Sequence, residues 1–377
     1  MATAHPVSAA IAARQTREEW ADRNSGRIMV LPAAVILLAF AIFPLIISIY
    51  LSLCRFSLDA GGFKLKFVGL YNFRRLLFGA QQYHFLGTLK PLEWPEWIGF
   101  GAFVILLLVW LTRYVATRFT ALGFIGRLLS ASLATGLVLA ALATLPAGAY
   151  QGTLLTTYFY VLVGVLVQFL LGLGLALLCA QPIHGRYLFR VIFFIPLMVT
   201  PVGVAYMFRM LADLQKGPFA PLSRALGFGE WSWATQAWSA RLMVLIGDTW
   251  QWTPFMFIVL LAAIESQPRD QLEAARMDGA GNFQVFRDIT WPAIAPIAAT
   301  VVLVRLIEAF KIIDIPNVLT AGGPGLATES LTLHSFIAWR TQDLGGSAAV
   351  GYLLLLVSTI TCVSFFNYVV RSTRRYQ

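Results

Sequence analysis

Charged residues are scarce in this sequence, since Asp, Glu, Lys and Arg make up only 12% of its 377 residues. A soluble domain usually carries about twice that charged fraction. Apolar residues account for 58% of the chain, and the mean hydropathy is +0.73. One soluble core cannot hide this much apolar sequence, so the composition favours a protein whose solvent is a lipid bilayer.

Cysteine and histidine are also rare, with three and four residues respectively. The cysteines lie far apart within or beside apolar runs, at Cys54, Cys179 and Cys362. Their spacing matches neither a metal site nor a redox pair, and we interpret them as small packing residues. The histidines are equally scattered along the chain, which argues against a metal centre.

The basic excess of the chain does not indicate a nucleic-acid-binding protein. The net charge is +10, and the arginines cluster beside apolar runs rather than alternating with aromatic residues. Loops on the cytoplasmic side of a membrane explain this distribution better than a nucleic-acid-binding face does.

Long apolar runs are what the sequence has in abundance. Eight of them approach the roughly 20 residues needed to cross about 30 Å of hydrocarbon. They lie at about 28–53, 97–117, 124–147, 153–180, 188–211, 242–264, 291–315 and 349–370. The sequence therefore predicts an all-α polytopic transmembrane helical bundle of about eight spans. Prolines inside several runs predict kinked helices, which a bundle tolerates because neighbouring helices satisfy the freed carbonyl groups.

The placement of arginines predicts the orientation of the chain in the membrane. Basic residues precede the first apolar run and follow the last, so an even number of spans places both termini in the cytoplasm. Residues 1–27 are polar for too long to be a cleavable signal and are expected to form a cytoplasmic tail. One loop, at about 55–95, is external by this count although it is basic; an external loop of this length tolerates such charge.

Between the sixth and seventh runs the chain turns charged and is broken by glycines, over residues 265–292. This stretch predicts two short helices on the cytoplasmic side. Pro268 suits the first turn of the first helix, where its missing N–H costs nothing. Gly279 suits the left-handed turn that ends this helix, and Asn282 can cap the second.

An apolar edge follows in the same loop, because Phe283, Phe286 and Ile289 repeat at every third position. An ordered loop that shows aromatic rings beside charges suits the groove of a partner protein. The same residues also suit a loop that only packs on its own bundle, and the residues by themselves leave both interpretations open.

The loop contains Glu273-Ala274-Ala275, then Gly279, Ile289 and Trp291-Pro292. This pattern resembles the cytoplasmic signature in the membrane subunits of binding-protein-dependent ABC importers. That signature reads EAA, three residues, Gly, nine residues, Ile, one residue and Leu-Pro. Every spacing agrees, and only the leucine is replaced, by Trp291.

Three further segments resemble the sugar-importer branch, the maltose/glycerol-phosphate-type permeases: residues 67–77, 190–208 and 318–339. The resemblance covers about 28–78 and 153–371, and it leaves a pair of spans between them as an insertion. The domains expected are a tail at 1–27, the first span and an external segment at 28–78, an inserted pair of spans at 79–150, and a core permease domain at 151–377 that contains the coupling loop 265–292.

The resemblance implies a type I ABC importer permease fold in the inner cell membrane, with no covalent chemistry in this chain. The resemblance implies that ATP and Mg belong to a separate ATPase and that this chain binds no cofactor. The lack of a Gly-x-x-x-x-Gly-Lys-Ser/Thr loop agrees with this, and it agrees equally with an ion-driven carrier. The implied partners are a cytoplasmic ABC ATPase dimer, a second permease subunit, an external solute-binding protein and membrane lipid, with no nucleic acid. The coupling residues carried over are Glu273, Ala274, Ala275 and Gly279, to which the apolar spacing adds Phe283 and Phe286.

Two polar stretches inside the apolar runs are candidates for the solute path. One comprises Asp248, Gln251 and Trp252, a carboxylate, an amide and an indole that suit a sugar, although the indole equally suits an interfacial anchor. The other comprises Arg305, Glu308, Lys311 and Asp314. Charges at this depth should not face lipid, so they either line a path for a hydroxyl-rich solute or pair with one another along the helix. Gln168 is expected to form a hydrogen bond between helices.

The function predicted is thus that of a permease subunit of an ATP-driven importer for a sugar or polyol, coupled through its EAA-type loop to a separate ATPase. An ion-gradient-driven secondary transporter is one alternative, although inverted repeats typical of such carriers are not visible. An ABC permease for a non-sugar solute is another, disfavoured by the segments 67–77 and 318–339. A membrane-embedded enzyme would need a clustered nucleophile or metal set within the runs, and none is visible in the sequence.

Overall fold

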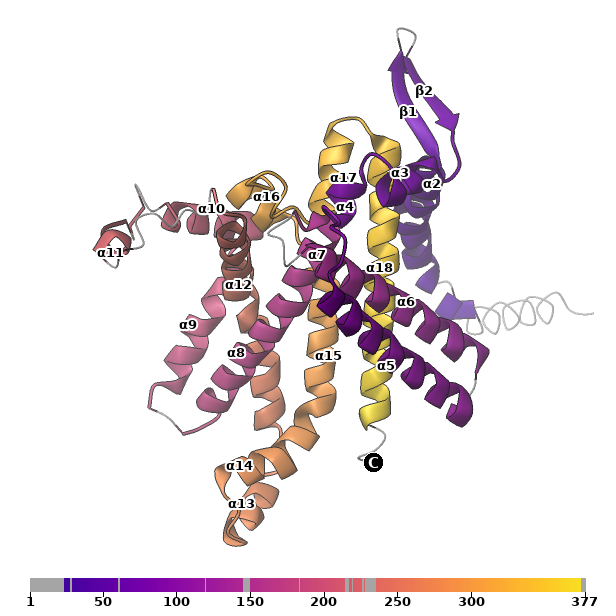
Figure 1. The fold of residues 1–377 in the computed structure, drawn as a ribbon. Coiled ribbons are helices and arrows are strands. Elements are labelled where there is room, and N and C mark those ends of the chain that lie inside the picture. Colours follow the sequence, from indigo (N-terminus) through magenta and orange to yellow (C-terminus); the bar gives the residue numbers. More distant parts are fainter. Residues whose placement is uncertain are drawn as a thin grey trace, which may run out of the picture.

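The computed structural model describes residues 24–27, 29–59, 62–118, 120–144, 150–182, 184–213, 217–218, 220–225, 227 and 235–373. The tail expected at 1–27 lies outside these residues except for its last four. The described chain is mostly helical (Figure 1), as the apolar runs predict.

Seven helices in the described part of the chain are long and apolar enough to cross a membrane. They are Asn24–Ser52, Trp94–Ala116, Gly123–Thr144, Gly152–Cys179, Ala237–Glu265, Asn282–Ala309 and Leu344–Val369. A bent pair of helices brings the number to eight if it is counted as one span. The predicted polytopic helical bundle is therefore confirmed.

The spans comprise several labelled elements, some of them π-helical. These are η1 (Leu38–Ile42), α2 (Phe43–Ser52), α5 (Trp94–Arg118), α6 (Ala121–Thr144), α7 (Gly152–Tyr158), η2 (Phe159–Val163), α8 (Gly164–Cys179), α12 (Ala237–Glu265), α14 (Asn282–Val285), η3 (Phe286–Thr290), α15 (Trp291–Ala309) and α18 (Leu344–Thr373). The shorter helices are α3 (Tyr71–Phe78), α4 (Gln82–Leu86), α11 (Ala220–Ala225), α13 (Arg269–Met277), α16 (Asp314–Thr320) and α17 (Leu331–Arg340).

The fifth predicted span is broken into two helices, α9 (Arg186–Met198) and α10 (Pro201–Leu211), which meet at an angle of 99°. The 13 residues of α9 extend only about 20 Å, less than the hydrocarbon thickness. Thr200 caps α10 by accepting a hydrogen bond from the Gly203 amide at 3.3 Å, and Pro201 occupies the first turn. The sequence predicts one continuous span here because both halves are equally apolar.

The two ends of the bundle differ in construction (Figure 1). One end carries an antiparallel hairpin, β1 (Cys54–Asp59) and β2 (Gly62–Phe67), paired from Cys54 with Phe67 to Asp59 with Gly62, together with α3, α4, α16 and α17. The opposite end carries α13 and α14, and the last described turn of α18 lies at the same end.

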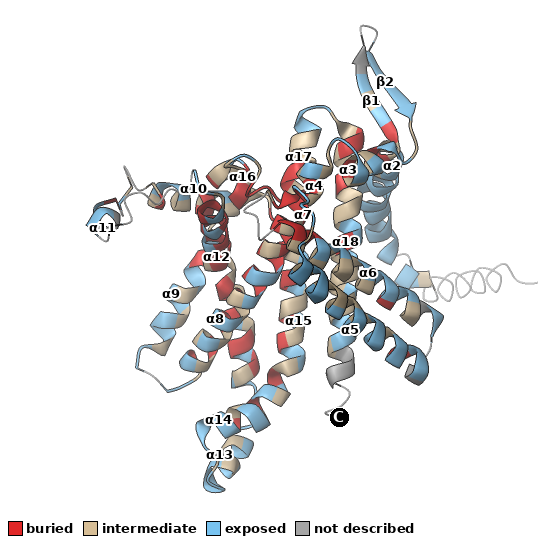
Figure 2. Cartoon of the chain, viewed as in Figure 1, coloured by how far each residue is buried: buried red, intermediate tan, exposed pale blue. Residues whose placement is uncertain are grey.

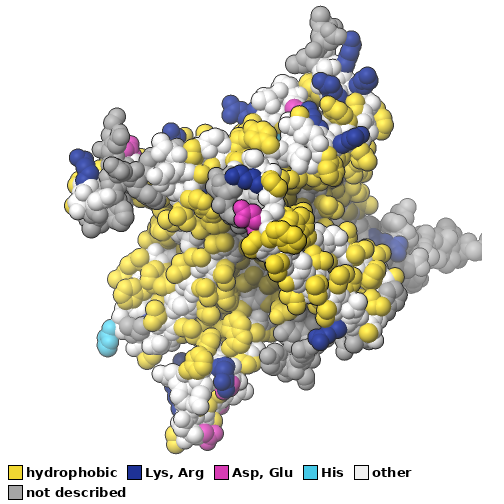
Figure 3. Space-filling view, in the orientation of Figure 1, with side chains coloured by type: hydrophobic (Ala, Val, Ile, Leu, Met, Phe, Trp, Pro, Cys, Tyr) yellow, Lys and Arg dark blue, Asp and Glu magenta, His cyan; other side chains and the backbone are white. Residues whose placement is uncertain are grey.

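The outer faces of the bundle are apolar and exposed, whereas burial is concentrated along α12 and the helices around it (Figure 2). On the face seen in Figure 3, hydrophobic side chains cover much of the middle of the bundle. Charged side chains occur around the hairpin and around α13 and α14, and a few lie between these two ends. This distribution suits a lipid-facing belt between two aqueous ends.

The helices α5 and α6 form an excursion that starts and ends at one place. The amide of Thr88 donates to the carbonyl of Tyr150 at 2.8 Å. A Cβ atom on Gly152 would collide with the backbone of Gly87, so these two glycines permit a close approach. The chain before α5 therefore meets the chain after α6 directly.

The long helices α8 and α12 pack closely against each other at Gly172. A Cβ atom added to Gly172 would lie 2.5 Å from the Cβ of Met256 and 2.9 Å from the Phe257 amide nitrogen. Gly172 thus allows the two backbones to approach, as small residues do at helix interfaces in membranes.

We predict that Gly172→Ala lowers the stability of the bundle by about 1–3 kcal/mol, because the added methyl group must push α8 away from α12. Thermal unfolding of the purified chain in detergent measures the change. Gly174→Ala is the matched control on the same helix, where an added Cβ meets no atom within 4 Å. Equal melting temperatures for the two variants would contradict this packing.

Candidate functional site

The loop between α12 and α15 is an ordered elbow that projects from the end of the bundle (Figure 1). Gly279 adopts a φ of +82°, the left-handed conformation that the sequence predicts for it. The amide of Gly279 donates to Arg276 at 3.1 Å and that of Ala280 to Ala275 at 3.0 Å, which closes the C-terminal end of α13.

The second helix of the elbow is capped one residue earlier than expected. Gly281 occupies the N-cap position of α14, and Asn282 is the first helical residue. The side chain of Gln284 accepts a hydrogen bond from the Gly281 amide at 2.8 Å, so a glutamine supplies the polar contact. At the base of the elbow, Gln267 Nε2 donates to the carbonyl of Thr290 at 3.3 Å and ties its two ends together.

The coupling residues predicted from the sequence lie on this elbow with different exposures. Glu273, Ala274 and Gly279 are exposed, whereas Ala275 is half-buried. Phe283 is 72% exposed, and its neighbour along the apolar edge, Phe286, is half-buried with its ring 6.2 Å from that of Trp291. Met277, which the sequence did not single out, is 88% exposed at the end of α13.

A buried polar network joins α8, α12 and α15 in the membrane-spanning part of the bundle. Gln168 Nε2 donates to Asp248 Oδ2 at 2.8 Å, and Arg305 Nε donates to Gln168 Oε1 at 2.8 Å. Arg305 also forms an ion pair with Asp248. All three side chains are buried away from water. Each charge is nevertheless compensated, because the ion pair and the hydrogen bonds replace the contacts with water. The interhelical role expected for Gln168 is observed.

The seven candidate path residues do not all meet. Asp248, Trp252 and Arg305 come together, with the guanidinium carbon 4.6 Å from the indole centroid. Gln251 instead donates to the carbonyl of Val199 at 3.1 Å and so supports the break between α9 and α10.

The rest of the predicted charge series lies apart from this network. Lys311 is exposed and Glu308 is half-buried, and the two pair with each other at 2.9 Å. Asp314 begins α16, beyond the end of α15. Arg305 thus pairs across helices rather than along its own helix.

The glycine-rich loop at 321–330 is held by side chains from two other regions. Its carbonyl groups at Leu326, Ala327 and Thr328 accept hydrogen bonds at 2.9, 2.7 and 3.3 Å. The donors are the side chains of Tyr150, Arg241 and Tyr160. The loop is therefore an integral part of the bundle end that carries the hairpin.

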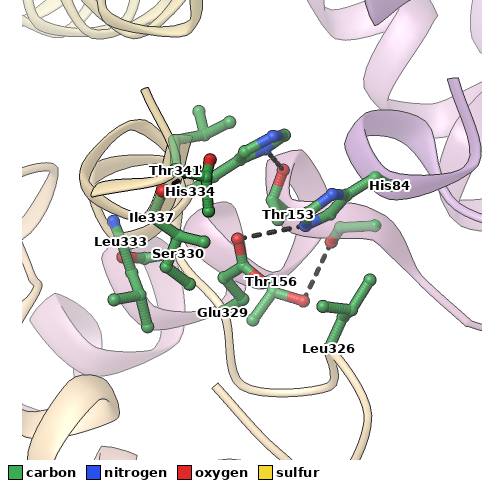
Figure 4. Close-up of polar contacts among 12 residues, drawn as sticks. His84, Thr153, Thr156, Leu326, Glu329, Ser330, Leu333, His334, Ile337 and Thr341 are labelled. Atoms are coloured by element: carbon green, nitrogen blue, oxygen red, sulfur yellow. Dashed lines mark hydrogen bonds and ion pairs between the residues drawn. The ribbon is translucent and has the colours of Figure 1, made fainter. Parts of the chain in front are cut away.

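Sequence reasoning missed a cluster of titratable groups next to this loop (Figure 4). His84 Nε2 lies 3.0 Å from Glu329 Oε1, and the rings of His84 and His334 stack with centroids 3.9 Å apart. Burial, followed by the charges of His84 and Arg75, lowers the pKa of His334 to about 3, so its imidazole is neutral. No local motif could have revealed this cluster, because His84 and Glu329 are 245 residues apart.

Comparison with known proteins decides what this architecture is. Residues 168–375 match the model of the binding-protein-dependent transport system inner membrane component family. The chain belongs to this family. It is therefore a multi-pass transport permease and not an enzyme, and the matched residues include the whole elbow and the network residues on all three helices.

Individual relatives agree with the family. The chain is 35% identical over 208 residues to the trehalose/maltose transport system permease protein MalF of Thermococcus litoralis, covering 55% of this chain and 70% of the relative. It is 30% identical over 210 residues to the sn-glycerol-3-phosphate transport system permease protein UgpA of Salmonella typhi, covering 55% and 70%. The predicted family resemblance is confirmed.

A solved structure shows the same fold over nearly the whole chain. It belongs to a bacterial ABC transporter involved in the import of the acidic polysaccharide alginate, with a TM-score of 0.62 at 16% identity. The match covers 94% of this chain and 99% of that chain, which confirms the ABC importer permease fold.

We predict that Asp248→Asn lowers the free energy of unfolding by about 3–5 kcal/mol, because it leaves Arg305 buried without a counter-charge. The double variant Asp248→Asn/Arg305→Met should recover much of the loss, since it removes both charges. Thermal unfolding in lipid nanodiscs measures both effects. Additive losses in the double variant would show that the two residues do not interact.

Proposed function

We propose that this chain is the permease subunit of an ATP-driven importer for a sugar or polyol, coupled to a separate ATPase through the elbow at 265–292. The observation that carries the proposal is the family match over 168–375, which contains the elbow, together with relatives named for trehalose, maltose and glycerol phosphate transport. An exposed, ordered elbow at one end of the bundle supports a docking role for it.

The orientation follows from this proposal. If the elbow meets a cytoplasmic ABC ATPase dimer, the C-terminus is also cytoplasmic, because α18 ends on the same side of the bundle as α13. An even number of spans then places the N-terminus there too. The end with the hairpin, α16 and α17 faces outward, where an external solute-binding protein docks. A related alginate importer has been solved with its periplasmic protein bound, which supports such a partner.

The second permease subunit is proposed to cover a hollow bounded by α2, α15, α17 and α18. The hollow has a volume of about 920 Å³, and its mostly apolar wall includes Lys311, Ser335, Trp339 and Tyr352. Lys311 is one of the candidate path residues, and Glu308 pairs with it. We assign these two residues to the mouth of the solute path, and Asp248, Gln251, Trp252 and Arg305 to the helices that line it. Asp314 stands at the start of α16 beside the outer loop.

The coupling residues Glu273, Ala274, Ala275, Gly279 and Phe283 are proposed to contact the ATPase directly, since most of them are exposed. Phe286 instead connects the elbow to the bundle through Trp291. We also propose that the stretch 79–150 is an insertion of two spans into the permease core, supported by the contact between Thr88 and Tyr150 at its ends.

We expect solute uptake to depend on ATP and to be inhibited by vanadate. The assay uses membrane vesicles from cells of the source organism that express this chain, and labelled maltose, trehalose and glycerol 3-phosphate as the first solutes. Vesicles lacking this chain are the control. Uptake that persists after ATP depletion but collapses with a protonophore would instead identify an ion-driven carrier.

We expect Gly279→Val to uncouple transport from ATP hydrolysis, because valine is strained at a φ of +82° and the end of α13 must shift. Gly281→Val is the matched control, since Gly281 has a φ of −70° that valine adopts freely. The assembled complex should retain ATPase activity but lose uptake only in the first variant. Normal uptake with Gly279→Val would refute the coupling role of this turn.

A further inference from the structure

Three potential metal ligands from two distant parts of the chain converge at the end of the bundle that carries the hairpin (Figure 4). His84 lies on α4, Glu329 in the loop before α17, and His334 on α17. One ligand atom from each residue lies within 4.8 Å of those from the other two. The scattered positions of the histidines in the sequence argue against a metal centre. The fold nevertheless stacks the rings of two of them, His84 and His334.

The carboxylate of Glu329 is the strongest sign that the cluster is built to hold a cation. Glu329 is fully buried, with an exposed fraction of 0%. Its Oε1 atom lies within hydrogen-bonding distance of His84 Nε2, whereas its buried Oε2 atom has no hydrogen-bond partner among the described residues. A buried carboxylate oxygen without a partner is destabilising, and a bound cation would satisfy it directly.

The two imidazoles supply the nitrogen donors. Their rings stack at an interplanar angle of 12°, an arrangement that two imidazolium cations would oppose by repulsion. Neutral imidazole offers a lone pair to a metal. The hydroxyl of Thr153, 3.4 Å from Nδ1 of His334, is a polar neighbour that can orient this ring, as groups surrounding metal ligands do.

We propose that His84, Glu329 and His334 form a site for one divalent transition cation of the Zn²⁺ class. Two imidazoles and one carboxylate are a donor set that zinc uses in proteins, whereas Ca²⁺ and Mg²⁺ prefer all-oxygen sites. Metal–ligand bonds of about 2.0–2.2 Å require the three groups to draw together through small rotations of their side chains. Water is the fourth ligand, and it enters past His84, whose side chain is 19% exposed.

Such a site would fasten together two regions of the chain that lie 245 residues apart in sequence. It would link α4, which precedes the α5–α6 excursion, to the glycine-rich loop and to α17. The metal would therefore brace the outward end of the permease, whichever solute the transporter carries.

The test is metal binding by the purified full-length chain in nanodiscs, stripped with EDTA and then incubated with Zn²⁺ alone. We expect about one Zn²⁺ per chain after gel filtration, measured by mass spectrometry of the metal, and a higher melting temperature that EDTA reverses. His84→Ala and Glu329→Gln should each weaken binding at least about tenfold, since even residues surrounding metal ligands change affinity by that factor. His184→Ala, at an exposed histidine outside the cluster, should bind like the wild type.

Two controls keep the outcome decisive. In the presence of EDTA the variants should still unfold in one cooperative transition, which shows that they are folded. Co²⁺ bound to the wild type should show the intense visible absorption of four-coordinate cobalt, so the site can be judged even if a variant fails to fold. Wild-type protein that binds no Zn²⁺, equal binding by His84→Ala, or the weak spectrum of six-coordinate cobalt would overturn the proposal.

Discussion

A charge pair in a medium that cannot solvate it constrains how the central helices of this bundle pack. Asp248 and Arg305 are both buried and ion-paired, and Gln168 donates to one and accepts from the other. Separating the two charges in a low-dielectric interior would cost far more than separating them in water. The pair therefore fixes how α8, α12 and α15 are rotated and how far each is shifted along its axis.

The position of this pair connects it to the elbow. The elbow begins where α12 ends and leads into α15 through η3, and those are the two helices that Asp248 and Arg305 join. Gln267 and Thr290 tie the base of the elbow at the other end of the same two helices. The helices α12 and α15 are thus fastened together at two levels, which suits the coupling role proposed for the elbow.

Much of the fold could be predicted from sequence because the bilayer imposes a simple rule on composition and length. Apolar runs give the spans, and a charged stretch interrupted by Gly279 gives the elbow. The break between α9 and α10 could not be predicted from hydropathy, because both helices are apolar. The turn is stabilised by a contact from another helix, the hydrogen bond that Gln251 donates to the carbonyl of Val199.

The candidate site was predicted in its residue types but not in its pairings. The regular spacing of Arg305, Glu308 and Lys311 predicts contacts along one helix, and only the last two form one. The partner of Arg305 depends on how α12 and α15 are rotated against each other, which no local pattern encodes. The contact between His84 and Glu329 is of the same kind, since it exists only after α4 has docked beside the glycine-rich loop.

The near contact of Gly87 with Gly152 has a consequence for how this chain is assembled. A segment that departs and returns through adjoining backbone positions can be added or removed without stretching anything that flanks it. The hydrogen bond from the Thr88 amide to the Tyr150 carbonyl already holds the two ends of this segment together, so a short connection could join them directly. As the insertion proposed above, the α5–α6 pair could vary in length and in lipid-facing surface while the helices outside it keep their arrangement.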